Sequence, residues 1–240
     1  MAAARSTPPL DRSLRQWLFL LPAVGMASVP AIVVPAILWA RFTFHRLHPD
    51  ADPGTYLTIS RAISDPAVGE PFALWVTAAA VILWVSLHAI LWMFVAEHPR
   101  RPAISPGRDR TSRLLWVAMW STMTATCVGM VMLSQYRLGS GATYRLHMIG
   151  SYVFFAGQAM TILLAAVYHS LVGAARAATV DYFFADRWRA RAGYAVFFAA
   201  VLYGVLFKVK SMDFGAATPW VISAYVELET ILIIVFLGYL

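Results

Sequence analysis

Six long apolar runs, separated by short polar segments, dominate the chain. A helix needs about 20 predominantly apolar residues to cross a hydrocarbon core about 30 Å thick. The runs cover residues 17–41, 73–96, 114–135, 146–174, 189–207 and 220–239. None of the segments between them is long enough to form a soluble domain. We therefore predict an all-α protein, a polytopic six-helix transmembrane bundle that forms a single domain over residues 1–240, in a membrane that the sequence does not identify.

The first apolar run follows a basic stretch, so it resembles the start of a secretory signal peptide. A retained span is favoured because the run is longer than the roughly 7–15 residues of a signal-peptide core. In addition, no clear small-x-small cleavage site follows the run. Pro22, Pro30 and Pro35 lie inside it, and each favours a kink. Kinked spans serve transport in some proteins, but more often they fit around neighbouring helices.

The connection at residues 42–72 is the only segment between spans that is large enough to shape a site outside the membrane. It is polar and contains four prolines. Apolar and polar residues alternate over residues 56–59, which is compatible with a strand or with a short interfacial helix.

The distribution of Lys and Arg predicts the side of the membrane that each connection faces. Twelve of the 19 cationic residues lie in the N-terminal tail and in the connections after the second and fourth spans, and the other seven lie on the opposite side. Cytoplasmic segments carry the excess of positive residues. Both the N and C termini are therefore predicted to be cytoplasmic, and the 42–72 connection external.

Composition and charge narrow the range of partners. Hydrophobic residues make up 60% of the chain and charged residues 13%, compared with about 25% charged residues in a soluble domain. Topology and anionic lipid headgroups account for the net charge of +7, so we expect membrane lipids and no nucleic acid as partners. Cys127 is the only cysteine, which excludes an internal disulfide.

Small residues recur at helical spacing in the third and fourth runs. Ser121, Ala125 and Gly129 are four residues apart, and Gly150 and Gly157 are seven apart. Small residues let helix backbones approach closely in lipid. Both sets predict packing seams within the bundle, and a dimerisation face is the alternative.

Glu227 and Glu229 in the last run are the most informative candidates for a functional site. A charged group near the membrane centre costs at least ~2.5 kcal/mol, so it usually faces a partner or a watery cavity. Two positions on a helix differ by about 200°, so the two carboxylates cannot line one wall together. Glu229 shares its face with Tyr225 instead. We expect one Glu in a polar pocket, with helix–helix hydrogen bonding as the alternative.

The histidines do not predict a haem or metal site. His88, His147 and His169 lie at different depths in their runs, so no pair could ligate one haem, and no metal-ligand spacing is present. His147, with Gln135, could instead form a polar site with Glu227 near the outer surface. An interfacial histidine with water partners is the alternative.

Several short segments resemble the Frag/DRAM/Sfk family, six-span proteins that include damage-regulated autophagy modulators and a factor that remodels GPI-anchor lipids. The resemblance extends over most of the chain, although the proline that precedes the first of these segments in the family is absent. The matching residues are Ile63-Ser64-Asp65 with Pro71, Gln135, His147-x-x-Gly150 with Phe155, and Ala224-Tyr225-Val226-Glu227. The resemblance implies a protein that works with lipids, and it favours Glu227 over Glu229.

The leading hypothesis is a lipid-interacting membrane protein. Gln135, His147 and Glu227 are expected to line a pocket that binds a lipid headgroup, with Tyr225 and Glu229 as secondary candidates. Headgroup binding, lipid remodelling and lipid organisation remain open, and no motif for nucleophilic catalysis, a cofactor or a phosphate loop is present. The alternative is a non-catalytic accessory subunit that packs against other membrane proteins. A transporter would need matching interrupted helices in two halves.

Overall fold

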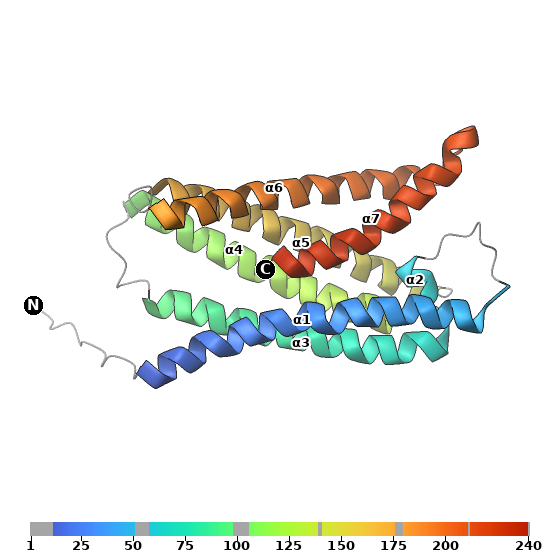
Figure 1. Ribbon diagram of the computed structural model, residues 1–240, viewed down its shortest axis with the longest axis horizontal. Coiled ribbons are helices and arrows are strands. Elements are labelled where there is room, and N and C mark those ends of the chain that lie inside the picture. Colours follow the sequence, from blue (N-terminus) through green and yellow to red (C-terminus); the bar gives the residue numbers. More distant parts are fainter. Residues whose placement is uncertain are drawn as a thin grey trace, which may run out of the picture.

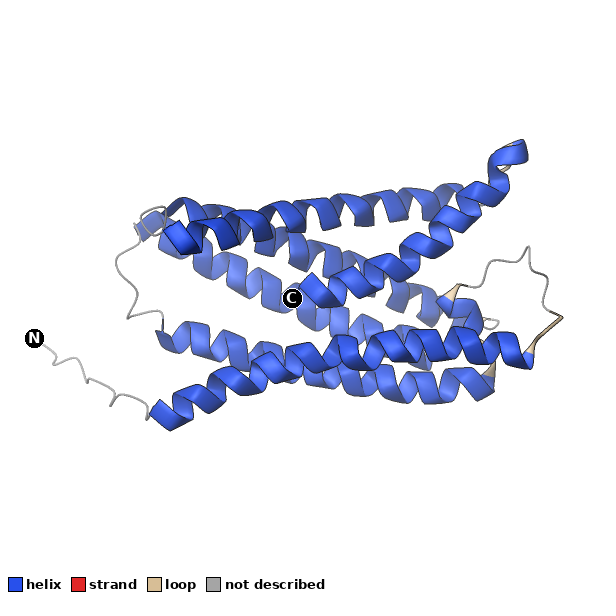
Figure 2. Ribbon diagram, viewed as in Figure 1, coloured by secondary structure: helices blue, strands red, loops and turns tan. Residues whose placement is uncertain are grey.

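The computed structural model describes residues 12–50, 58–97, 106–138, 141–175, 180–210 and 212–239, and the regular structure in these ranges is helical (Figures 1 and 2). Six of the helices are long and apolar enough to cross a membrane. They are α1 (Arg12–Leu47), α3 (Pro66–Glu97), α4 (Pro106–Gln135), α5 (Ala142–Ala175), α6 (Val180–Val209) and α7 (Thr218–Tyr239). The predicted all-α fold with six helices that could span a membrane is confirmed, and the side of the membrane that each terminus faces stays a prediction.

Helices that are neighbours in the chain also pack side by side, as expected when connections are short. The pairs α1 with α3, α3 with α4, α4 with α5, and α5 with α6 are in contact, and α7 contacts α1, α5 and α6. The spans alternate in direction, so α1 begins at the end of the bundle toward which α7 runs (Figure 1). Helix α1 continues through its three prolines, and its axis bends along its length (Figure 1).

Close backbone contact joins α4 to α5. A Cβ atom added to Gly129 would lie 2.5 Å from the backbone nitrogen of Phe154, and one added to Gly150 would lie 2.6 Å from that of Leu133. The predicted glycine seam is therefore a contact within the bundle. Ser121 and Ala125, by contrast, are exposed, so this pair lies outside the seam.

A short helix, α2 (Ile59–Ala62), lies in the connection between α1 and α3. Thr58 is its N-cap, and the Thr58 hydroxyl accepts a hydrogen bond from the backbone N–H of Arg61. A helix therefore begins at the last residue of the 56–59 alternation, whereas residues 56 and 57 lie outside the described residues. We call the end of the bundle that carries α2 and the connection between α6 and α7 the α2 end.

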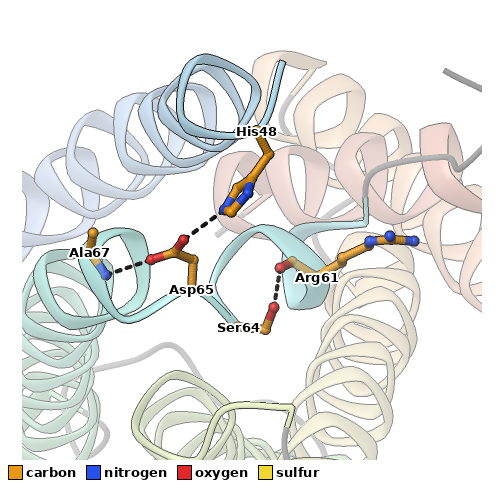
Figure 3. A network of polar contacts seen from close by, with 5 residues as sticks. All are labelled: His48, Arg61, Ser64, Asp65 and Ala67. Atoms are coloured by element: carbon orange, nitrogen blue, oxygen red, sulfur yellow. Dashed lines mark hydrogen bonds and ion pairs between the residues drawn. The ribbon is translucent and has the colours of Figure 1, made fainter. Parts of the chain in front are cut away.

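A small polar network fixes α2 to its neighbours (Figure 3). The carboxylate of Asp65 accepts a hydrogen bond from the backbone N–H of Ala67 at 2.8 Å, which caps the start of α3, and it lies 2.7 Å from Nε2 of His48 at the end of α1. The hydrogen bond with His48, followed by that with Ala67, lowers the pKa of Asp65. The hydroxyl of Ser64 donates to the Arg61 carbonyl at 2.6 Å. The Ile63-Ser64-Asp65 segment is thus the junction between α2 and α3.

Candidate functional site

A cavity of about 570 Å³ lies among α5, α6, α7 and the α2 segment. We call it the lateral pocket. Ligand sites in proteins occupy about 300–1,000 Å³, so this cavity is large enough for a substantial part of a lipid. Polar residues that line it are Thr58, Ser60, Tyr144, His147, Ser151, Tyr152, Tyr203, Lys208, Lys210, Tyr225 and Glu229, and its apolar lining includes Phe155, Ala159, Met160, Phe197, Ala200 and Val201.

The mouth of the lateral pocket lies between α5 and α6. Tyr152 and Met160 on α5, and Val201 and Gly204 on α6, line the cavity and are also exposed on the outside of the bundle. The residues of α7 that line the cavity are buried. The pocket therefore opens sideways, onto the outside of the bundle between α5 and α6.

Polarity changes along the pocket in the same direction on both helices. On α5, the lining begins with Tyr144, His147 and Ser151 at the α2 end and becomes apolar by Met160; on α6, which runs the opposite way, it changes from Lys208 back to apolar residues. The stretch from Tyr144 to Met160 covers roughly 24 Å of helix at 1.5 Å per residue. One leaflet, headgroups included, is about 20–22 Å thick. The lining of the pocket therefore extends over about the thickness of one leaflet and has the polarity gradient of a lipid molecule.

His147 connects three elements at the α2 end. The imidazole is 1% exposed, and its Nδ1 lies 3.1 Å from the carbonyl oxygen of Leu133 and 2.6 Å from that of Tyr136. Carbonyl oxygens only accept, so Nδ1 carries the proton, and in the neutral ring Nε2 accepts a hydrogen bond from the Ser60 hydroxyl at 3.1 Å. These carbonyls belong to the last turn of α4 and the residue after it, where helices leave carbonyls without internal partners. His147 therefore ties α4 and α2 to α5.

Glu229 is the buried acid of the site. It is 4% exposed, and its Oε2 accepts a hydrogen bond of 3.3 Å from the backbone N–H of Ile59 at the start of α2. The positive charges of Arg41 and Lys210 also act on this carboxylate. Glu229 thus holds α2 against α7 and forms part of the pocket floor.

Stacked aromatic rings form the wall between α6 and α7. The rings of Tyr203 and Tyr225 are nearly parallel, with centroids 5.2 Å apart, and their hydroxyls are 3.3 Å apart. Phe155 packs against Tyr203 at 4.8 Å. On the α5–α6 side, the rings of Tyr152 and Phe207 meet edge to face at 5.7 Å across the mouth. These distances are typical of aromatic pairs that stabilise their contact.

The structure brings together only part of the predicted site. His147 and the two secondary candidates, Tyr225 and Glu229, line the lateral pocket. Glu227 is exposed and does not line it, because it lies on the other side of α7. Gln135 does not line it either; its side-chain amide donates a hydrogen bond to the Thr77 hydroxyl on α3. The helical phase argument is correct, whereas the preference for Glu227 as the inward-facing acid is not.

Sequence reasoning assigned no role in the site to Thr58, Ser60, Lys208 or Lys210. Ser60 lies in a helix of four residues and Thr58 caps it, and so short a helix has no periodic pattern to reveal it. The lysines had a usable signal, because they are the only two lysines in the chain and lie two positions apart.

Comparison of the chain with protein-family models, curated proteins and solved structures gave no match. The resemblance to the Frag/DRAM/Sfk family therefore stays a prediction. Among the described residues, no group of three or more His, Cys, Asp or Glu side chains is arranged to hold a metal ion.

Proposed function

We propose that this protein binds one lipid molecule in the lateral pocket, with the headgroup at the α2 end and an acyl chain along α5 and α6. The observation that carries the proposal is the polarity gradient of a pocket that opens toward the bilayer. An apolar chain gains nothing by entering a polar cavity, and a headgroup gains nothing in an apolar one. Lipid binding is also what the resemblance to the Frag/DRAM/Sfk family implies. By the distribution of positive residues, the α2 end faces away from the cytoplasm.

Gly204 offers a direct test, because it lines the mouth and a Cβ added to it would meet no atom within 4 Å. Gly204→Phe adds a ring at the mouth on a Cβ atom that meets no other atom of the bundle. Gly238→Phe is the matched control: Gly238 is exposed, also has free space around its Cβ, and does not line the pocket.

The measurement is the number of lipid molecules that co-purify with each variant in mild detergent, determined by native mass spectrometry. Wild type and Gly238→Phe are expected to retain one lipid, and Gly204→Phe several-fold less, with equal thermal stability of the two variants. Equal lipid in all three proteins overturns the proposal. A stoichiometric protein partner with no bound lipid also overturns it, and supports the accessory-subunit alternative.

A further inference from the structure

The two lysines of the chain, Lys208 and Lys210, both line the lateral pocket at its α2 end. The other 17 of the 19 Lys and Arg residues are arginines. Lys208 is exposed at the mouth, and Lys210 is partly buried. The backbone N–H of Lys210 still bonds to the Leu206 carbonyl at 2.8 Å, so the end of α6 fixes where both side chains begin.

Two aromatic rings hold the ammonium group of Lys210 inside the pocket. Nζ lies 4.1 Å from the ring centroid of Tyr225 and 4.4 Å from that of Phe207, within the range of a cation–π contact. A lysine that merely marks the end of a span extends toward the aqueous surface, whereas this one is directed to the wall of a cavity. The face of an aromatic ring is a weaker hydrogen-bond acceptor than an anionic oxygen. An anion that enters the pocket would therefore be a better partner than the two rings for the three N–H donors of the Lys210 ammonium group.

The charges that line the pocket favour an anion. The lining contains two lysines and one carboxylate, that of Glu229. This carboxylate already accepts the N–H of Ile59 and is acted on by the charges of Arg41 and Lys210. One carboxylate does not balance two lysines, so the lining keeps a net positive charge. Hydroxyl groups of Thr58 and Tyr144 line the same end, and hydroxyls donate readily to phosphate oxygens. The Ser60 hydroxyl also lines it but already donates to His147.

We infer that the lipid held in the lateral pocket carries a phosphate group, which lies between Lys210 inside the pocket and Lys208 at its mouth. The inference rests on the proposed function, since it names the headgroup chemistry of the same site. Lysine suits this role because its ammonium binds phosphate as a compact point charge. An acyl chain attached to such a phosphate would extend along the apolar part of the cavity toward Met160.

The test compares two lipids that have the same acyl chains, phosphatidylglycerol and diacylglycerol, bound to the detergent-solubilised protein and counted by native mass spectrometry. Wild type is expected to bind phosphatidylglycerol at least tenfold more tightly, and Lys210→Gln to lose most of that preference while binding diacylglycerol as before. Arg145→Gln is the matched control, because Arg145 is exposed at the α2 end and does not line the pocket. It removes one positive charge without changing the preference.

Failure of this inference differs from failure of the proposed function. If Gly204→Phe abolishes binding of both lipids but Lys210→Gln and Lys208→Gln leave the preference unchanged, the pocket binds lipid without recognising phosphate. If Arg145→Gln lowers the preference as much as Lys210→Gln does, the effect is general attraction to anionic lipids, and the inference is also overturned. If Gly204→Phe changes the binding of neither lipid, the pocket does not bind lipid at all.

Amine acylation gives a second measurement, because only the two lysines and the N-terminal amine react. Burial lowers the pKa of Lys210, and the Glu229 carboxylate acts in the opposite direction, so Lys210 is expected to react at lower pH than an ordinary lysine. Phosphatidylglycerol should protect Lys210 several-fold, and diacylglycerol should not. Equal protection by soluble glycerol phosphate at the same concentration would identify a site for free phosphate esters and overturn the lipid headgroup assignment.

Discussion

Replacing Gly129 by alanine should force α4 and α5 apart. The added Cβ would lie 2.5 Å from the backbone nitrogen of Phe154 and 2.9 Å from the carbonyl oxygen of Gly150. Both atoms belong to the backbone of α5, so no side chain can rotate away to make room. The helices must separate, and the loss of close contact extends along the seam, because van der Waals contact is a main source of helix association in lipid.

The magnitude is clearest as a difference between two variants. Alanine stabilises a helix by roughly 0.5–1 kcal/mol relative to glycine, and this gain applies equally to Gly204→Ala, whose Cβ would meet no atom within 4 Å. Overpacking costs about 1–3 kcal/mol, and clashes with two backbone atoms place Gly129→Ala in the upper part of that range. The difference in unfolding free energy between the two variants should therefore be about 2–3 kcal/mol.

The assay is equilibrium unfolding in mixed micelles with increasing sodium dodecyl sulfate, followed by the loss of helical circular dichroism. Gly204→Ala should unfold at a slightly higher detergent fraction than wild type, and Gly129→Ala at a clearly lower one. Unfolding of both variants at the same fraction would refute the reasoning, because it would mean that α4 and α5 are not in backbone contact at Gly129.

Three further predictions concern the polar contacts at the α2 end, each measured by the same unfolding assay or by thermal unfolding. His147→Ala leaves two carbonyls at the end of α4 without their partner and should lower stability by about 1–3 kcal/mol; unchanged stability would contradict the role of the imidazole. Glu229→Gln keeps an acceptor for the N–H of Ile59, so Glu229→Ala should be less stable than Glu229→Gln by about 1–3 kcal/mol, and equal stability would exclude that hydrogen bond. Asp65→Asn keeps the cap of α3 but loses the charge paired with His48. Since the folded pKa of Asp65 is lowered, the stabilisation it gives is present above the ordinary aspartate pKa of about 4 and is lost as the pH falls through the folded value. Wild type should therefore melt above Asp65→Asn at pH 7, and the gap should close under strong acid; a gap that persists there would show that the carboxylate charge is not its cause.

The spans could be read from the sequence because the length of an apolar run follows directly from the thickness of the bilayer. The fifth span illustrates the accuracy: residues 189–207 were predicted, and the apolar helix covers Arg187–Val209. The seam glycines could be predicted for a similar reason, since close backbone approach requires small residues whatever surrounds them.

The inward face of α7 could not be predicted. In a soluble helix, polar residues mark the exposed side, but α7 carries apolar residues around its whole circumference, because lipid outside and packed helices inside are equally apolar. Glu227 and Glu229 were therefore equivalent by composition. The difference arises from the contact of α7 with α2, where the N–H of Ile59 meets Glu229, and a four-residue helix held by tertiary contacts gives no sequence pattern.

Because of the short helix α2, the packing of the spans and the shape of the pocket can change separately, although the two usually change together in a helical bundle. The contacts that hold the bundle together lie largely between its six long helices, whereas Thr58 and Ser60, which line the polar end of the pocket, belong to a connection between two of them. Substitutions in that connection can reshape the polar end of the pocket while the seam between α4 and α5 stays intact. A family of proteins built on this bundle could therefore diversify the molecules it recognises through a few residues outside its spans, and a designer could do the same.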